Sequence, residues 1–205
     1  MRTIRKRTDL GRALLYGATG ITMISVSTAL ADDKPKGTYA LVGSGICLIS
    51  PGGFKDDGHG NYVIPNGSNT FESSSNFWDT ATFNGDGTGT TTGKFAAIAA
   101  PSPAGPGSAA GGTYTYQFKH SPISGNEYTT SAVAGTFKGT IDSGPRAGQT
   151  FMINKVDRTH IISMDQKSIT VTNAAPYVEE ITYSGDPKGP FQRICNIAGT
   201  FFKLQ

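Results

Sequence analysis

The sequence predicts an all-β protein, folded as a single antiparallel up-and-down β-barrel of about 8–10 strands. Short runs rich in Thr, Tyr, Phe, Val and Ile alternate with clusters of Gly, Asn, Asp and Pro, and 27 of the 205 residues are glycine. No segment carries the 3.6-residue hydrophobic period that an amphipathic helix would need. In addition, two cysteines near opposite ends of the chain could join the first strand to the last.

The expected strands follow from the β-forming runs and the turn residues between them. They cover residues 38–42, 46–50, 76–83, 88–97, 113–120, 127–133, 136–141, 150–156, 158–164, 168–173, 177–183 and 193–204. We expect some of these segments to merge. Residues 83–88 contain Asn-Gly and Asp-Gly pairs that predict a hairpin, and the Pro- and Gly-rich segment 100–112 predicts a flexible loop.

The first 31 residues are typical of a secretion signal. A basic start precedes the largely apolar run 13–26, and Ala29-Leu30-Ala31 matches a small-x-small cleavage pattern. Cleavage after Ala31 would leave residues 32–205 as one barrel domain in the periplasm or the medium. Five of the 18 basic residues and one of the 15 acidic residues lie in the signal, which leaves 13 basic and 14 acidic residues. This balance gives no electrostatic basis for binding nucleic acid, and we expect no transmembrane segment in the mature chain.

Cys47 and Cys195 are expected to form a disulfide, because an even cysteine count in an exported chain usually means pairing. In the chain-entropy model, a bridge closing so long a loop stabilises the fold by about 5 kcal/mol. It also requires the first and last strands to lie close together, as in a closed barrel. A β-sandwich could bring the ends together as well and is the alternative fold.

The clearest alternation of inward and outward residues lies in 113–120, where Tyr114, Tyr116, Phe118 and His120 share one face. In the segment 177–183, alternate residues place a carboxylate among aromatic rings. Such faces could line a cavity for a small apolar molecule, or they could be ordinary packing positions. The predicted ligand-binding residues are Tyr39, Tyr114, Tyr116, Phe118, Tyr177, Glu179 and Tyr183.

Motifs for catalysis are missing from the sequence. It has no G-x-S-x-G, S-x-x-K or H-E-x-x-H pattern, and Ser44, between two glycines, is expected to lie in a flexible loop. The three histidines His59, His120 and His160 lack the local spacing of a zinc site. We therefore expect no metal and no cofactor, and we assign no catalytic residue.

Three short segments carry a resemblance to known proteins. Gly37-Thr38-Tyr39 with Arg193 resembles the lipocalin arrangement, in which an arginine of the last strand packs on the aromatic residue of a G-x-W motif. Together with segments 86–90 and 193–196, these residues resemble uncharacterised exported bacterial proteins with calycin-like or allene-oxide-cyclase-like barrels. That resemblance implies an apolar cavity and, in the cyclase case, an isomerisation that depends mainly on cavity shape.

Three hypotheses for function follow. The first is an exported barrel that binds a small apolar ligand in its interior. The second is a structural or interaction protein of the cell envelope, with a filled barrel and an unknown protein partner. The third is a cyclase-like or isomerase-like enzyme that uses Glu179 as a base or electrostatic stabiliser.

Overall fold

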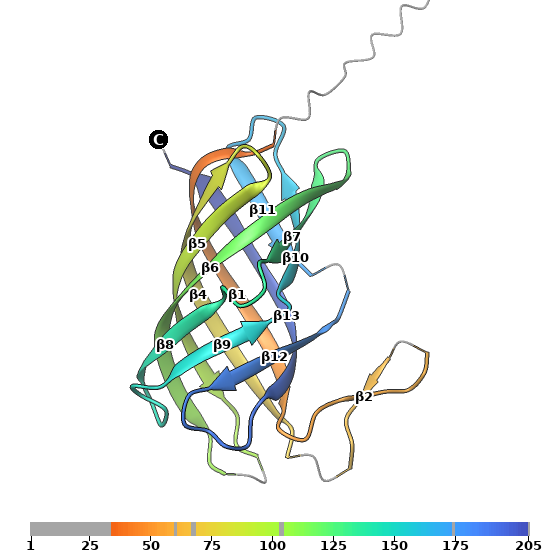
Figure 1. The fold of residues 1–205 in the computed structure, drawn as a ribbon, viewed down its shortest axis with the longest axis vertical. Coiled ribbons are helices and arrows are strands. Elements are labelled where there is room, and N and C mark those ends of the chain that lie inside the picture. Colours follow the sequence, from red (N-terminus) through yellow and green to blue (C-terminus); the bar gives the residue numbers. More distant parts are fainter. Residues whose placement is uncertain (1–33, 60, 67–68, 103–104, 174, 205) are drawn as a thin grey trace, which may run out of the picture. The chain divides into compact units, whose positions relative to one another are not determined.

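The computed structural model describes residues 34–205, except residues 60, 67–68, 103–104, 174 and 205 (Figure 1). The predicted secretion signal lies outside the described residues, so its cleavage stays a prediction. Every regular element in the described part is a strand. None of the described residues forms a helix that is long and apolar enough to cross a membrane.

The strands differ greatly in length. They are β1 (Lys36–Ser50), β2 (Lys55–Asp56), β3 (Tyr62–Val63), β4 (Phe71–Asn84), β5 (Thr88–Ala99), β6 (Ser108–Ser124), β7 (Glu127–Ala132), β8 (Lys138–Ser143), β9 (Thr150–Asn154), β10 (Asp157–Ile162), β11 (Ser168–Thr172), β12 (Val178–Tyr183) and β13 (Phe191–Lys203). The short strands β2 and β3 pair only with each other, in the connection between β1 and β4.

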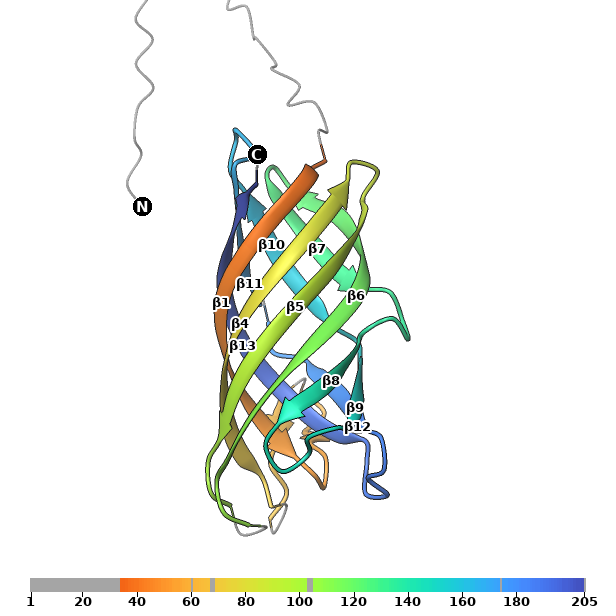
Figure 2. The ribbon, with the colours of Figure 1, turned by 90° about the vertical axis from the view of Figure 1, so that its left-hand side faces the viewer.

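The long strands belong to a closed ring of eight. The order β1-β4-β5-β6-β7-β10-β11-β13 returns to its start because β13 also pairs with β1. A second series of strand pairings also connects β6 with β13: β6 pairs with β8, β8 with β9, β9 with β12, and β12 with β13. Figure 2 shows β7, β10 and β11 towards one end of the ring and β8, β9 and β12 towards the other. The predicted all-β, up-and-down fold is therefore confirmed, and the sandwich alternative is wrong.

Six short strands of the sheet are the halves of three interrupted long strands. β7 and β8, β9 and β10, and β11 and β12 are consecutive in sequence, yet the members of each couple pair towards different ends of the ring. The interruptions are residues 133–137, 155–156 and 173–177; Lys155 has a φ of 59°. Polar residues of the interior, Arg158 and Tyr177 among them, lie in or beside these interruptions.

Two hydrophobic clusters fill the ring. The first is built of Tyr39, Leu41, Ala81, Phe83, Phe118, Tyr128, Ile162, Ile169, Val171 and Phe201. The second is built of Phe137, Ile141, Phe151, Ile153, Val156, Ile181 and Phe191. Tyr116 packs against both clusters and so connects them.

Inward-facing glycines are matched by aromatic rings on the neighbouring strand. In the sheet register Gly43 lies opposite Phe77, and the Phe77 ring fills the space that a side chain at residue 43 would take. Aromatic rings also lie against four further glycines: Phe118 at Gly89, Tyr114 at Gly93, Phe95 at Gly112, and Phe151 at Gly139. At Gly93 the carboxylate of Asp79 lies closer still. Small and large residues thus complement each other across the interior, as in other small barrels.

Two local predictions need correction. The segments 38–42 and 46–50 are one continuous strand, β1, so Ser44 lies in a strand and not in a loop. The predicted loop 100–112 is too long at its end, because β6 already begins at Ser108 and pairs with β5. The hairpin at 83–88 is confirmed, with positive φ angles of 84° at Gly85 and 90° at Gly87.

Candidate functional site

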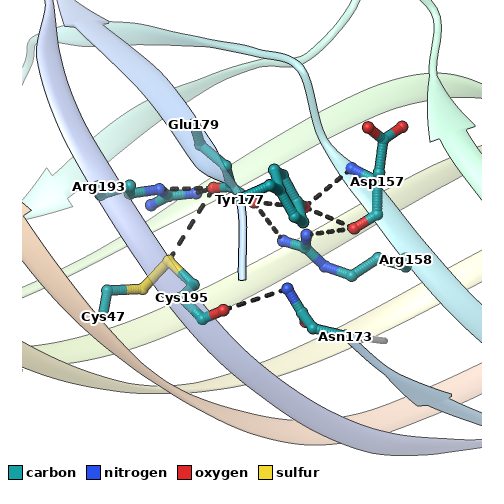
Figure 3. Close-up of a disulfide and its surroundings, with 8 residues drawn as sticks. All are labelled: Cys47, Asp157, Arg158, Asn173, Tyr177, Glu179, Arg193 and Cys195. Atoms are coloured by element: carbon teal, nitrogen blue, oxygen red, sulfur yellow. Dashed lines mark hydrogen bonds and ion pairs between the residues drawn. A yellow bond between two sulfur atoms is a disulfide. The ribbon is translucent and has the colours of Figure 1, made fainter. Parts of the chain in front are cut away.

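A buried ion-pair cluster lies inside the ring, centred on Glu179 (Figure 3). The Glu179 side chain is 0% exposed and accepts hydrogen bonds from two arginines. Arg158 Nη2 lies 2.8 Å from Glu179 Oε1, and Arg193 Nη2 and Nε lie 2.6 and 2.7 Å from Oε2. Arg193 is the register partner of Glu179 on β13, whereas Arg158 comes from β10. Each carboxylate oxygen is therefore held by a guanidinium.

Tyr177 completes this cluster. Its hydroxyl lies 2.9 Å from Glu179 Oε1 and 2.5 Å from the Asp157 carbonyl oxygen, and it accepts a hydrogen bond of 2.8 Å from the Asp157 N–H. The Arg158 guanidinium lies 5.7 Å from the centre of the Tyr177 ring. The sequence prediction grouped Tyr177 with Glu179, and the structure brings them into contact. It did not include the two arginines, which are distant in sequence.

The charge of Glu179 is set by its partners. Burial alone raises the pKa of Glu179, but the charges of Arg193 and Arg158 outweigh burial, so that the pKa lies below its ordinary value. A carboxylate in this state is a weak base. The enzyme hypothesis that assigned Glu179 as a general base therefore gains no support from its surroundings.

The predicted disulfide is present beside this cluster. Cys47 and Cys195 occupy directly opposite positions of β1 and β13, and their sulfur atoms are bonded. Cys195 Sγ lies 4.0 Å from Glu179 Oε2, and the Cys195 carbonyl accepts a 3.1 Å hydrogen bond from Asn173 Nδ2. The bridge thus joins the first strand to the last, as the sequence predicted.

A second buried carboxyl, Asp79 on β4, has no cationic partner among the described residues. It accepts a short hydrogen bond from the hydroxyl of Tyr114. Burial raises the pKa of Asp79 to about 7, against the lowering effect of the Tyr114 bond. Burial and the nearby Asp79 charge raise the pKa of Tyr116 to about 12.

The remaining predicted ligand-binding residues face inward but do not share one site. Tyr39 and Phe118 belong to the first hydrophobic cluster, and the Tyr39 hydroxyl donates to the Gln166 carbonyl at 2.9 Å. Tyr114 and Tyr116 stack on Phe137 at 5.3 and 4.7 Å. Their role in ligand binding stays a prediction.

Tyr183 packs elsewhere, against Phe191 and under the Arg146 guanidinium, which lies 4.4 Å from its ring centre. The lipocalin-like packing of Arg193 on Tyr39 is wrong. In the register of β1 and β13, Tyr39 pairs with Lys203, and Arg193 pairs with Ile49 ten positions away. Lys203 takes the expected place instead, with its ammonium 5.8 Å from the Tyr39 ring centre.

Two buried histidines form a cluster that the sequence reasoning missed. Nδ1 of His120 and Nδ1 of His160 lie 2.8 and 3.0 Å from the hydroxyl of Thr130. Burial lowers the pKa of His120 to about 4 and that of His160 to about 3, so both rings are neutral at neutral pH. Alternation placed His120 inside, but nothing local indicated its partners.

A groove outside the ring is the other feature that the sequence reasoning missed. It has a volume of about 510 Å³, and its floor is formed by Ile46 and Leu48 of β1 and by Ile194 and Asn196 of β13. These residues face outward because they alternate with the two cysteines along their strands.

The walls of the groove come from two connections. One wall is Phe54, Tyr62 and Ile64, from the β1–β4 connection that Figure 1 shows beside the lower part of β13. The other wall is Asn173, Ala175 and Pro176, from the interruption between β11 and β12. The described lining contains no charged residue. The sequence did carry one indication of this groove: apolar residues stand in the otherwise polar segment 51–66.

Comparisons with known proteins identify no family. No family model matches the sequence, and no curated protein matches it. Among solved structures, the chain is similar to DynF from the dynemicin biosynthesis pathway of Micromonospora chersina. The two are 11% identical with a TM-score of 0.45, and the match covers 84% of this chain and 83% of that chain. This is a distant resemblance of fold and says nothing about function.

Proposed function

We propose that this protein binds a small, largely apolar molecule in the outer groove over β1 and β13, with the ring as its scaffold. The observation that carries the proposal is the groove itself. Its volume of about 510 Å³ lies within the usual size of small-molecule sites, and most of its lining is aliphatic or aromatic. Two asparagines supply polar groups among the apolar side chains, another common property of such sites.

The packing of the ring interior favours a site outside it. Phe83 alone has ring contacts with Tyr39 at 5.3 Å and Phe118 at 4.9 Å, and Phe137 stacks on both Tyr114 and Tyr116. A ligand among these residues would have to displace aromatic side chains from one another. The expectation of an apolar ligand is therefore kept, but its site is moved from the interior to the outer surface.

The groove floor belongs to the most continuous pairing of β13. Twelve residues of β1, from Tyr39 to Ser50, pair with β13 without a break, and the disulfide crosses the same two strands. A floor held in this way changes little when a ligand binds, which reduces the ordering cost of binding.

We also propose that the protein is exported, with cleavage after Ala31 and a final location in the periplasm or the medium. The Cys47–Cys195 bridge is compatible with an oxidising compartment. N-terminal sequencing of protein recovered from the periplasm and the medium tests this proposal. Recovery of a chain that still begins at Met1 in the cytoplasm alone would contradict it.

Ligand binding can be tested with an uncharged fluorescent probe, N-phenyl-naphthylamine, in titrations of the mature protein. We expect saturable binding that Ile46→Glu weakens about tenfold or more, because a carboxylate on the groove floor must be desolvated against the probe. Ile98→Glu is the matched control. Both isoleucines face outward from long strands and are well exposed, at 56% and 65%, but only Ile46 lines the groove.

The variants also separate the two possible places for a ligand. If Ile46→Glu and Ile98→Glu bind the probe as the wild type does, the groove is not the site and an interior site is favoured. If neither the wild type nor the variants bind any probe saturably, the proposed function is wrong.

The interaction hypothesis remains a second candidate, because two large apolar side chains are exposed next to each other on the outside of the ring. Val42 on β1 and Trp78 on β4 are register partners, and they are 62% and 49% exposed. An exposed apolar pair of this kind is a common element of protein contacts. We expect Trp78→Ser to reduce co-sedimentation of the protein with isolated cell envelopes if this surface binds there. Unchanged co-sedimentation would remove the candidate.

A further inference from the structure

The polar groups of the groove indicate which head group a ligand should carry. Asn173 Nδ2 already donates to the Cys195 carbonyl, and this bond fixes the direction of the carboxamide. Its Oδ1 atom is buried and accepts no hydrogen bond from any described residue. A buried acceptor without a donor is unfavourable, so a ligand that supplies one gains binding energy there.

Asn196 offers a second polar contact on the groove floor. Its side chain is exposed and makes no hydrogen bond within the described part of the chain. It stands opposite Ile46 in the register of β1 and β13. The polar side-chain groups of the groove are thus two neutral amides and the hydroxyl of Tyr62, on an otherwise apolar surface.

Charges around the groove disfavour an anionic head group. Glu72, which is exposed, lies opposite Leu48 in the sheet, and Asp56 lies opposite Tyr62. Asp57 follows Asp56 in the sequence and is a third acidic side chain. Hydrogen bonds from the Asn61 side chain and from the backbone N–H of His59 lower the pKa of Asp57, which favours its charged form. Lys55, which lies opposite Val63, is a cation of the same connection. Of these four side chains beside the groove, three are acidic and one is basic.

We infer that the ligand is an uncharged amphiphile with a hydrogen-bond donor, such as a hydroxyl group, and that Asn173 is the residue that selects it. This inference rests on the proposed function. The apolar body of the ligand lies on Ile46, Leu48 and Ile194, and the donor bonds to Asn173 Oδ1. Because Asn173 Oδ1 is buried, the Asn173 side chain must shift towards the groove when the donor binds.

The test compares three compounds with unbranched ten-carbon chains as competitors of N-phenyl-naphthylamine. Decanol carries a donor, decyl methyl ether is neutral but can only accept, and decanoate is an anion at neutral pH. We expect decanol to displace the probe at about fivefold lower concentration than the ether, since one neutral hydrogen bond separates them. Decanoate should be the weakest competitor.

Variants then assign the preference to Asn173. On Asn173→Ala we expect decanol and the ether to displace the probe at equal concentrations. The matched control Asn154→Ala, on the exposed face of β9, should keep the fivefold preference for decanol. Thermal midpoints of the variants, measured by circular dichroism, show whether each is folded. If Asn173→Ala unfolds, Asn173→Ser serves in its place, because the shorter hydroxyl cannot reach the same donor.

The outcomes separate this inference from the proposed function. Equal competition by decanol and the ether in the wild type would overturn the inference while leaving the groove as a ligand site. A preference that survives in Asn173→Ala would overturn the role of Asn173. Failure of all three compounds and of the probe itself to bind would overturn the proposed function.

Discussion

The two buried carboxyl groups of the ring, Glu179 and Asp79, have opposite properties. Glu179 is held by two guanidinium groups, and its pKa is lowered although it is completely buried. Asp79 has the hydroxyl of Tyr114 as its hydrogen-bond donor, and its pKa rises to about 7. Burial acts in the same direction on both. The comparison shows that the charge of a buried acid is decided by the neighbours that the fold brings to it.

The largest effect is expected at Glu179. Glu179→Gln leaves Arg158 and Arg193 without a countercharge in the interior, and we expect the free energy of unfolding to fall by about 3–5 kcal/mol. Glu180→Gln is the matched control. Glu180 follows Glu179 in sequence and points to the other face of β12, so its substitution should lower the free energy of unfolding by less than about 0.5 kcal/mol. Urea unfolding of both variants measures the difference. Equal effects would mean that the ion pairs contribute little.

A second, opposite effect is expected at Asp79. Because its folded pKa is raised, its contribution to stability is present below its ordinary pKa and is lost as the pH rises through about 7. Asp79→Asn removes this loss, so the variant should be more stable than the wild type by about 2–4 kcal/mol at mildly alkaline pH. The difference should shrink towards acidic pH.

Urea titrations at several pH values measure this effect, with Asp142→Asn on the exposed part of β8 as control. A wild-type protein whose stability does not fall between acidic and alkaline pH would contradict the raised pKa. Glu179, whose pKa is lowered, should contribute no such loss on the alkaline side.

The smallest effect concerns the donor to Asp79. Tyr114→Phe removes the hydrogen bond but keeps the ring that packs on Phe137, and should cost about 1–2 kcal/mol. Since that bond lowers the pKa of Asp79, its loss should also move the alkaline destabilisation to higher pH. Tyr183→Phe is the control, because the Tyr183 hydroxyl makes no hydrogen bond within the described residues. A Tyr114→Phe protein with unchanged pH dependence would show that the bond does not tune Asp79.

Local sequence patterns predicted a large part of this fold. Alternation with a period of two placed Tyr114, Tyr116, Phe118 and His120 on one inward face, and the structure bears this out. The hairpin at 83–88 followed from glycines that accept positive φ angles. These features depend on residues that are neighbours in the chain, so one sequence is enough to predict them.

Other features depend on the closing of the ring. Glu179 meets Arg158 and Arg193 because β12 pairs with β13 and an interrupted strand brings β10 alongside; the partners are 21 and 14 residues away in sequence. The error over Arg193 and Tyr39 has the same origin, since only the register shows that they lie ten positions apart along their strands. The groove likewise needs the segment 51–66, the interruption at 173–177 and β13 to meet in space.

The sequence by itself therefore determined the all-β class, the inward and outward residues of the strands, and the pairing of two cysteines. The tertiary structure alone decided which buried acid keeps its charge and where an apolar ligand finds room. The physical reason is the distance along the chain over which each interaction acts. Strand alternation and turn geometry act between adjacent residues, whereas desolvation, ion pairing and cavity shape depend on the atoms that surround a group after the ring has closed.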